Sequence, residues 1–544
     1  MPTCSRRLAA ASHVTAARRS LSCGMLLAAL AAACVLSLAA APALAQSVPG
    51  TSKVAPPKPK PKPESKPEAK PKDEPSTRPD GETDGKSGSK SNEEPDAAGT
   101  GLEFTGEKVR IESVGFAMEL PASCRAESNG VAGNPAIQIT PADGTWIINA
   151  TVQRSGSGGT LKEIADAMSQ QATGAQLNPA QLMDRVSNLS IGGQPAERFY
   201  LKRPSIEASK PALISGYTIF EPLKGQFVVI DVTAGEPLWT KARPAYETLV
   251  ATATFEDPKL IEQGRRIAVE AGIKLMADVS PAVLAEVVGT SKKERWERMA
   301  VPATSGANGD DQELGYRRIT TWMGKRGEME LGRDRARMSG SDLDEGALVQ
   351  IQARLLLPST KVSGQASGQR AVIDVFSSFF MAKDRASEAW VVKMTQRDGA
   401  KAVTSTETGA RVGDQMTVRI DDPTGATRNL DPVVRGGGYV SRVEGYLLPQ
   451  LLVRSKIPIE FGFYAYQSEL SRIALRTDVL EAAKDAPGMW RLTTKLHPDA
   501  KPQVMTLNER GEVVRTVLAD GSEWTATTLE ELRRLWQSKG LPLD

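Results

Sequence analysis

We predict the fold of the larger part of the chain from residues 457–480, IPIEFGFYAYQSELSRIALRTDVL. Aromatic and β-branched residues predict strands over 457–466 and 473–480, with a short polar turn between them. Further runs of strand length follow one another from 316–322 to 523–525. Many strands with few helices predict one large curved antiparallel sheet or open barrel over residues 313–544.

Aromatic residues make up only 5% of the chain, yet four of them lie in the first of these strands. Alternation along a strand sends Phe461 and Phe463 to one face and Tyr464 and Tyr466 to the other. Such residues form a sheet core against helices, or they line an apolar groove for a lipid or a partner segment. Phe461, Phe463, Tyr464 and Tyr466 are therefore our candidate ligand-binding residues.

Two helices are predicted among these strands. One covers residues 439–453, and the other follows Thr528-x-x-Glu531, a capping box near the end of the sequence. This distribution of strands and helices resembles the half-barrels of periplasmic lipoprotein carriers of the LolA type, although no motif of that family can be matched to a residue here.

Residues 102–257 mix strands and helices, which predicts an α+β domain. Seven strands are expected between residues 108 and 233. A helix is expected to begin at the capping box Thr160-x-x-Glu163, and two more are predicted over 180–187 and 244–252.

Four motifs in this region resemble the PsbP-like fold. They are Gly115-Phe116-Ala117-Met118-Glu119-Leu120-Pro121, Thr160-Leu161-Lys162-Glu163, Gly193-Gln194-Pro195-Ala196, and the stretch from Tyr246 to Phe255. The resemblance covers residues 103–257. It implies an antiparallel sheet between helices and a non-enzymatic assembly or accessory role, and it supplies no catalytic residue.

The segment between these two regions is predicted to be helical. Apolar residues at helical spacing follow residue 258, and Ser280 is a suitable N-cap for a second helix. We therefore expect a helical bridge over residues 258–303 and a flexible loop over 304–312.

Residues 1–45 have the pattern of a secretory signal peptide. Arginines precede an apolar stretch that starts at Gly24, and Ala43-Leu44-Ala45 stands before Gln46. We expect cleavage between Ala45 and Gln46, which would leave the mature protein periplasmic or secreted. If uncleaved, the apolar stretch is long enough to span a bilayer, and it is the only membrane contact that the sequence suggests.

Residues 46–101 predict a disordered linker rich in Pro, Lys and Glu. Between residues 49 and 100 the sequence has 11 Pro, ten basic and ten acidic residues and no aromatic residue. Such a composition cannot bury enough apolar surface to fold, and alternating proline with charge favours an extended chain. We interpret this segment as a spacer that tethers the folded regions to the cell envelope.

The net charge of the chain indicates whether a nucleic-acid partner is expected. Its net charge is +3, but residues 1–45 contain four arginines and no acidic residue. Without them, 64 of the 68 basic residues remain against 65 acidic ones, a net charge of −1. A near-neutral chain has no general attraction for nucleic acid, so no nucleic-acid partner is expected.

Catalytic chemistry is restricted by the scarcity of thiol and imidazole groups. Beyond residue 45 the chain has one cysteine, Cys124, and one histidine, His497, which lies in a predicted turn. One chain can therefore form neither an internal disulfide nor a Cys/His zinc cluster, and no catalytic residue or cofactor is predicted.

Carboxylate clusters leave two alternatives open. Asp342, Asp344 and Glu345 begin like a Ca²⁺ loop, although they also suit a turn, and they are our candidate metal ligands. Asp342 or Asp344 could also serve a carboxylate-based hydrolase of envelope polymer. A strand is predicted over residues 326–331. The arginines between Arg317 and Arg337 are expected to form ladders of charged pairs across neighbouring strands, on a face exposed to solvent.

These patterns predict an exported, tethered cell-envelope protein of the binding or accessory type. Its partner would be an envelope protein or an apolar ligand such as a lipid. The alternatives are the carboxylate-based hydrolase and a purely structural envelope component, so enzymatic activity is not expected but stays open. The sequence does not give the oligomeric state.

Overall fold

The structure of the protein is a computed structural model that describes residues 102–128, 135–155, 158–176, 178–207, 209–289, 291–303, 310–357, 371–398, 401–434 and 436–543. The predicted signal peptide over 1–45, its cleavage site at Ala45 and Gln46, the linker over 46–101 and most of the loop over 304–312 lie outside these residues. Within them, no helix has the length and apolarity needed to cross a bilayer.

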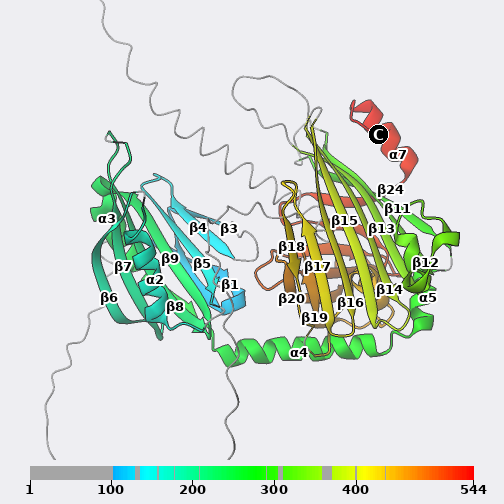
Figure 1. Ribbon diagram of the computed structural model, residues 1–544, viewed down its shortest axis with the longest axis horizontal. Helices are drawn as coiled ribbons and strands as arrows, with labels where there is room; N and C mark the ends of the chain where they lie inside the picture. Colours follow the sequence, from blue (N-terminus) through cyan, green and yellow to red (C-terminus); the bar gives the residue numbers. More distant parts are fainter. Residues whose placement is uncertain are drawn as a thin grey trace, which may run out of the picture. The chain divides into compact units, whose positions relative to one another are not determined.

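An antiparallel sheet of seven strands forms the centre of the first folded region (Figure 1). Its order is β3-β4-β5-β9-β8-β7-β6. A smaller sheet, β1-β2-β10, lies in the same region. The strands are β1 (Phe104–Ile111), β2 (Phe116–Pro121), β3 (Cys124–Ser128), β4 (Ala136–Pro141), β5 (Trp146–Arg154), β6 (Gln181–Ile191), β7 (Gln194–Arg203), β8 (Leu213–Leu223), β9 (Gln226–Gly235) and β10 (Thr254–Phe255).

Helices α2 (Leu161–Thr173) and α3 (Trp239–Ala251) cover opposite faces of this sheet. Phe199 packs in the core that includes α2, whereas the next residue, Tyr200, packs in the core that includes α3. Successive residues of a strand point to opposite faces, so the sheet lies between the two helices. Thr160 and Glu163 form the predicted capping box of α2.

The helix predicted over 180–187 is wrong, because residues 181–187 belong to β6. Apolar residues at Leu182, Met183, Val186 and Leu189 imitate helical spacing. In the structure they lie on an edge strand with two irregularities in its pairing to β7, and Leu182 and Met183 are exposed. A strand with few buried positions does not alternate clearly between apolar and polar residues. The spacing of its apolar residues therefore fitted the period of a helix better than that of a strand.

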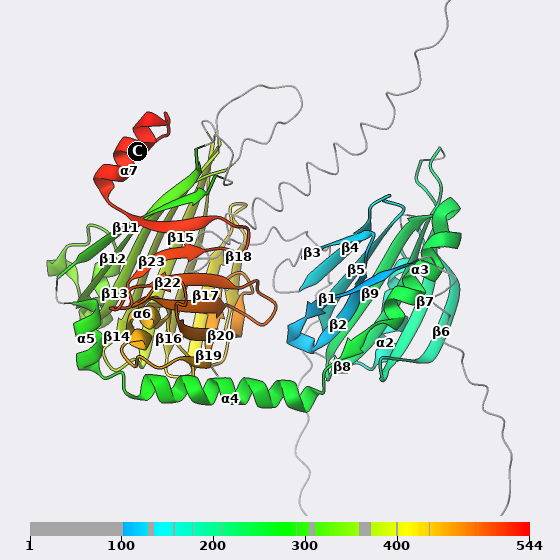
Figure 2. The ribbon, with the colours of Figure 1, turned by 180° about the vertical axis from the view of Figure 1, so that it is seen from behind.

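A single antiparallel sheet of 14 strands dominates the remaining chain, and this confirms the prediction of a large antiparallel sheet (Figures 1 and 2). Its order is β18-β17-β16-β15-β14-β13-β12-β11-β24-β23-β22-β21-β20-β19. The strands are β11 (Lys293–Val301), β12 (Gln312–Lys325), β13 (Glu345–Leu356), β14 (Val372–Ala382), β15 (Ser387–Asp398), β16 (Lys401–Val412), β17 (Gln415–Asp421), β18 (Thr427–Leu430), β19 (Ile459–Gln467), β20 (Arg472–Ala482), β21 (Trp490–Lys495), β22 (Gln503–Leu507), β23 (Val513–Val517) and β24 (Glu523–Thr527).

The two edges of this sheet are bridged by the segment that follows β18. Val433 pairs with Gln415 of β17, and Tyr439 pairs with Tyr464 of β19. Backbone hydrogen bonds of 2.8 and 2.9 Å join Tyr464 to Gly438 and Val440. One short segment thus pairs with β17, which is next to the edge strand β18, and with the opposite edge strand β19, and it leads directly into α6 (Arg442–Val453).

Helix α6 lies against one face of the sheet, which we call the inner face. It contacts β13, β14 and α5 (Pro281–Val288), and Figure 2 shows it among the strands. Its leucines, including Leu447, Leu448 and Leu452, are buried in the same core as Phe379, Phe461 and Trp524. Helix α4 (Pro258–Ala277) packs on β19, where Gly272 lies directly against the carbonyl oxygen of Gly462.

Other elements also differ from the prediction. Residues 293–301, expected in the helical bridge, form β11 and pair with β12 and β24. Residues 326–329 form the 3-10 helix η4 (Arg326–Met329) instead of a strand, and they pack over Trp322 and Phe380 on the outer face. The polar strand β16 was not predicted, because threonines, serines and charged residues outnumber its apolar residues.

Candidate functional site: the ionic cluster at helix α6

Helix α6 begins at a capping box formed by Ser441 and Glu444. The Ser441 hydroxyl accepts a hydrogen bond from the Glu444 amide (3.1 Å), and the Glu444 carboxylate accepts one from the Ser441 amide (2.7 Å). Ser441 also lies 2.9 Å from the sulfur of Met381 on β14. These bonds satisfy the first amides of α6 and fix its start on the inner face.

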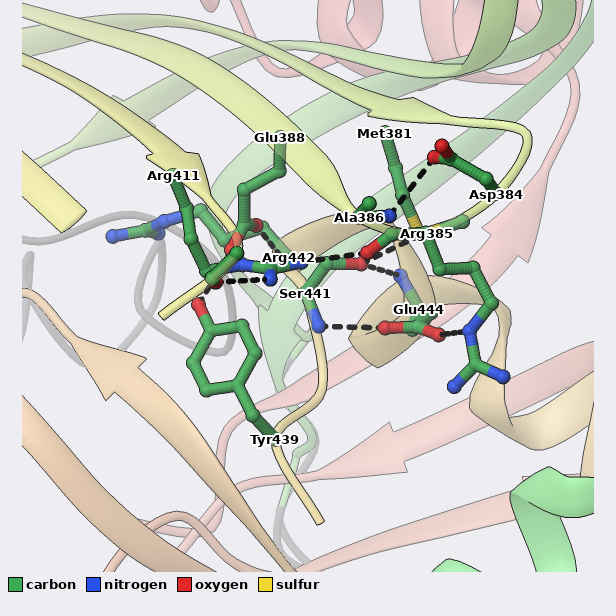
Figure 3. Close-up of polar contacts among 11 residues, drawn as sticks. Met381, Asp384, Arg385, Ala386, Glu388, Arg411, Tyr439, Ser441, Arg442 and Glu444 are labelled. Atoms are coloured by element: carbon green, nitrogen blue, oxygen red, sulfur yellow. Dashed lines mark hydrogen bonds and ion pairs between the residues drawn. The ribbon is translucent and has the colours of Figure 1, made fainter. Parts of the chain in front are cut away.

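Glu388 of β15 receives three hydrogen bonds beside the start of α6 (Figure 3). The donors are the Tyr439 hydroxyl at 2.7 Å, Arg411 Nε at 2.9 Å and the backbone amide of Arg442 at 3.1 Å. Glu388 is only 2% exposed. Burial raises the pKa of Glu388, and its three donors oppose that shift. Burial and the Glu388 charge together raise the pKa of Tyr439 well above its ordinary value.

Glu407 of β16 binds the side chain of Arg442. Its Oε1 accepts from Arg442 Nη2 at 2.9 Å, from Trp390 Nε1 at 2.8 Å and from the Ser468 hydroxyl at 2.8 Å. The Arg442 guanidinium also lies 5.0 Å from the Trp390 ring and 5.3 Å from the Tyr466 ring. Arg442 is thus held by a carboxylate and by aromatic faces in a largely water-free place.

Arg385 links the same cluster to other elements. It adopts a left-handed backbone conformation (φ 64°) in the turn between β14 and β15. Its side chain donates to Glu444 and to the carbonyl oxygen of Met276 in α4. Its own carbonyl accepts from Arg411 at 2.8 Å. The cluster therefore joins β15, β16, α4 and α6 through side chains distant in sequence.

The carboxylates of this cluster hold arginine side chains and the start of α6. Glu388, Glu407 and Glu444 each accept hydrogen bonds from arginine or backbone groups. A general base needs a carboxylate oriented toward a substrate proton, and a nucleophile needs a partner base. These carboxylates instead orient Arg385, Arg411 and Arg442, and thereby the first turn of α6.

We expect Glu469, in the turn after β19, to make stability depend on pH. Burial raises its pKa to about 7, with Glu407 adding to the shift and Arg442 opposing it. The unfolded chain loses this proton near pH 4.5. Between these values only the folded protein holds the proton, so its stability falls as pH rises through this range.

Glu469→Gln should therefore leave stability unchanged at pH 4 and raise it by about 1 to 3 kcal/mol at pH 8. Urea unfolding at the two pH values measures the difference. Glu460→Gln, at an exposed position of β19, serves as the control and should show no such growth with pH. An equal effect of Glu469→Gln at both pH values would contradict the expectation.

The candidate ligand-binding aromatics lie in the core of the 14-stranded sheet region. Phe461, Phe463 and Tyr466 are 0%, 1% and 4% exposed, and the Phe461 and Phe463 rings are 5.5 Å apart. Tyr466 packs against Trp390 with 5.5 Å between ring centroids. Tyr464 is half-buried at the bridge to Tyr439. Three of the four are thus packed against their own chain, and a ligand-binding role for them stays a prediction.

The candidate metal ligands do not converge. Asp342 pairs with Arg333 and takes part in a capping box with Ser339 at the 3-10 helix η6 (Gly340–Leu343). Glu345 pairs with Lys383, and this contact lowers the pKa of Glu345. Asp344 is the C-cap residue of η6. In the part of the chain that the structure describes, no group of three Asp, Glu, His or Cys side chains is placed to hold a metal ion, and a metal-binding role for Asp342, Asp344 and Glu345 stays a prediction.

The cluster at α6 was missed because its members look like ordinary surface charges in sequence. Glu388 lies near the start of β15, Glu407 lies between Thr406 and Thr408, and Arg411 lies near the end of the polar strand β16. Arg317, expected on a solvated face, is 6% exposed and pairs with the buried Glu297. The only available signal was the capping box Ser441-x-x-Glu444 within the helix predicted over 439–453.

No family model matches the chain, and a comparison with curated proteins finds no match. Solved structures do match. One is the PsbP of the cyanobacterium Synechocystis sp. PCC 6803, which is 11% identical over 28% of this chain and 92% of that protein, with a TM-score of 0.23. A PsbP, the kind of protein whose likeness we expected from the sequence, is thus among the matching structures, as a distant likeness.

Two other matching structures belong to proteins of unknown function. A protein from Pseudomonas aeruginosa is 14% identical over 27% of this chain and 94% of its own, with a TM-score of 0.20. A beta-barrel-like protein from Brucella abortus is 12% identical over 44% of this chain and 98% of its own, with a TM-score of 0.27. The resemblance to LolA-type carriers stays a prediction.

Proposed function

We propose that this protein is an exported, non-enzymatic binding or accessory protein of the cell envelope. In this proposal the inner face of the 14-stranded sheet binds an apolar ligand or an apolar segment of an envelope protein. The Pro/Lys/Glu-rich linker tethers the folded regions. The sequence of residues 1–101 supports the export and the tether, and the arrangement of α6 supports the binding.

The placement of α6 is the observation that carries the proposal. The inner face is covered by a short leucine-rich helix rather than by a second sheet. Polar contacts fasten the start of this helix, and its two connections contain left-handed residues, Gly438 (φ 86°) before it and Lys456 (φ 52°) after it. A face that accommodates one apolar segment of its own chain has the shape and chemistry to accept another.

Native mass spectrometry of the protein, extracted from the envelope fraction with a mild detergent, tests this proposal. We expect an added mass from a bound lipid or a partner protein, together with saturable binding of the neutral apolar dye N-phenyl-1-naphthylamine. A ligand-free and partner-free monomer that does not bind the dye would leave the purely structural alternative.

The hydrolase alternative loses the residues on which it relied. It required two carboxylates facing each other across a cleft. Asp342 instead pairs with Arg333 and caps a turn, and Asp344 ends that turn. We therefore do not propose a hydrolytic activity for these residues.

A further inference from the structure

A second ionic cluster lies on the inner face, on strands β11 and β12. Glu297 is 1% exposed and pairs with Arg317 directly across from it in the strand register. Arg295, two residues before Glu297, approaches the other carboxylate oxygen at 3.0 Å. One buried carboxylate therefore serves two guanidinium groups.

Several hydrogen-bond donors beside this cluster have no acceptor among the described residues. They are Arg295 Nε, Trp524 Nε1 and the Tyr446 hydroxyl. Trp524 is 1% exposed, and its ring lies 4.2 Å from the Arg317 guanidinium. Burial raises the pKa of Tyr446, and the charges of Arg317, Glu297 and Arg295 act on the same hydroxyl. Buried donors normally find partners, so these three donors near the Glu297 cluster are available to an acceptor group.

The residues around this cluster indicate which kind of ligand group would accept these hydrogen bonds. Met299 and Ile319, on the same two strands, are buried in the apolar core. The side chain of Arg295 is 31% exposed, so the cluster reaches from the core to solvent at this residue. A guanidinium edge fits the two oxygens of a carboxylate, and such a charge-assisted pair is stronger than a neutral hydrogen bond. Apolar neighbours suit a ligand with a hydrocarbon body.

We propose that Arg295, Tyr446 and Trp524 form a subsite for the carboxylate end of a long-chain apolar acid. Arg295 supplies the charge, and the Trp524 and Tyr446 donors orient the carboxylate oxygens. This inference rests on the proposed function and specifies its ligand as an acyl carboxylate rather than a neutral lipid. On the outer face, Arg318, the residue after Arg317, is already bonded to Gln352 at 2.6 Å and lies near Glu294.

Binding of the fluorescent fatty acid cis-parinaric acid and of its methyl ester tests this subsite. The full chain should bind the acid at least tenfold more tightly than the ester, because the ester cannot form the charged pair. Arg295→Gln should weaken acid binding about tenfold and leave ester binding unchanged. Arg318→Gln is the matched control on the outer face of the same strands, with a similar side-chain exposure of 32%, and should change neither.

Each outcome separates the subsite from the general function. Equal binding of acid and ester by the native protein, or equal loss of both in Arg295→Gln, would overturn the subsite while leaving apolar binding in place. Tighter binding of hexadecyl phosphate than of hexadecanoic acid, measured by displacement of the probe, would overturn the assignment to a carboxylate. Binding of neither probe would overturn the proposed function itself.

Discussion

Replacing Arg442 with methionine should lower the free energy of unfolding by about 3 to 5 kcal/mol. Arg442 is the partner of Glu407 in a place where both side chains are at most 10% exposed. Methionine keeps much of the length of the side chain but removes its charge, and Glu407 would remain buried with only the Trp390 and Ser468 donors. Urea unfolding followed by far-ultraviolet circular dichroism measures the loss.

Arg397→Met is the matched control for this prediction. Arg397 lies on β15 and pairs with Asp374 at 2.9 Å, but its side chain is 58% exposed. An exposed pair contributes little, so the loss should stay below about 1 kcal/mol. Equal losses in the two variants would show that the cluster at α6 does not have the buried character that we assign to it.

Gly409→Ala should destabilise the protein by about 3 kcal/mol, because the Trp390 ring occupies the space of the new methyl group. Gly409 lies opposite Trp390 in the register of β15 and β16, and an added Cβ would be 2.0 Å from the indole carbon Cζ2. The ring cannot move without weakening the Trp390 hydrogen bond to Glu407 and its contact with Arg442. Thermal unfolding and near-ultraviolet circular dichroism would report the loss and the altered tryptophan environment.

Gly264→Ala provides a control of opposite sign. Gly264 lies within α4, and an added Cβ there meets no atom within 4 Å. Alanine favours a helix over glycine, so this variant should gain about 0.5 to 1 kcal/mol. If Gly409→Ala proved as harmless as Gly264→Ala, the indole would not pack over Gly409 as described.

The elements that were predicted correctly have strong local signals. The capping boxes at Thr160 and Thr528 begin helices where expected, because their hydrogen bonds form between residues only three apart. Strand β14 has apolar residues on both of its faces, and this composition alone predicts a strand. By contrast, β6 has no buried residue, and the buried residues of β16 include Ser405, Glu407 and Arg411, so neither strand shows the alternation of apolar and polar residues that marks a half-buried strand.

The ionic cluster could not be predicted because its members are distant in the sequence. Glu388 and Arg442 are 54 residues apart, and Glu407 and Ser468 are 61 apart. Each looks like a solvent-exposed residue until the sheet curves and α6 lies on its inner face. The aromatic strand over 457–466 was recognisable, but whether its rings line a groove or fill a core depends on where α6 packs, which its own sequence does not determine.

The pairing of β11 with β24 has a consequence for how the chain matures. Trp296 lies opposite Thr527, and Ala300 lies opposite Glu523, so the first strand of the 14-stranded sheet has one neighbour made soon after it and another made more than two hundred residues later. During synthesis from the N-terminus, one side of β11 must stay unpaired until β24 emerges. A long-lived open strand edge invites association with other chains. The incomplete chain, rather than the finished protein, is therefore the state that exposes an open strand edge at β11.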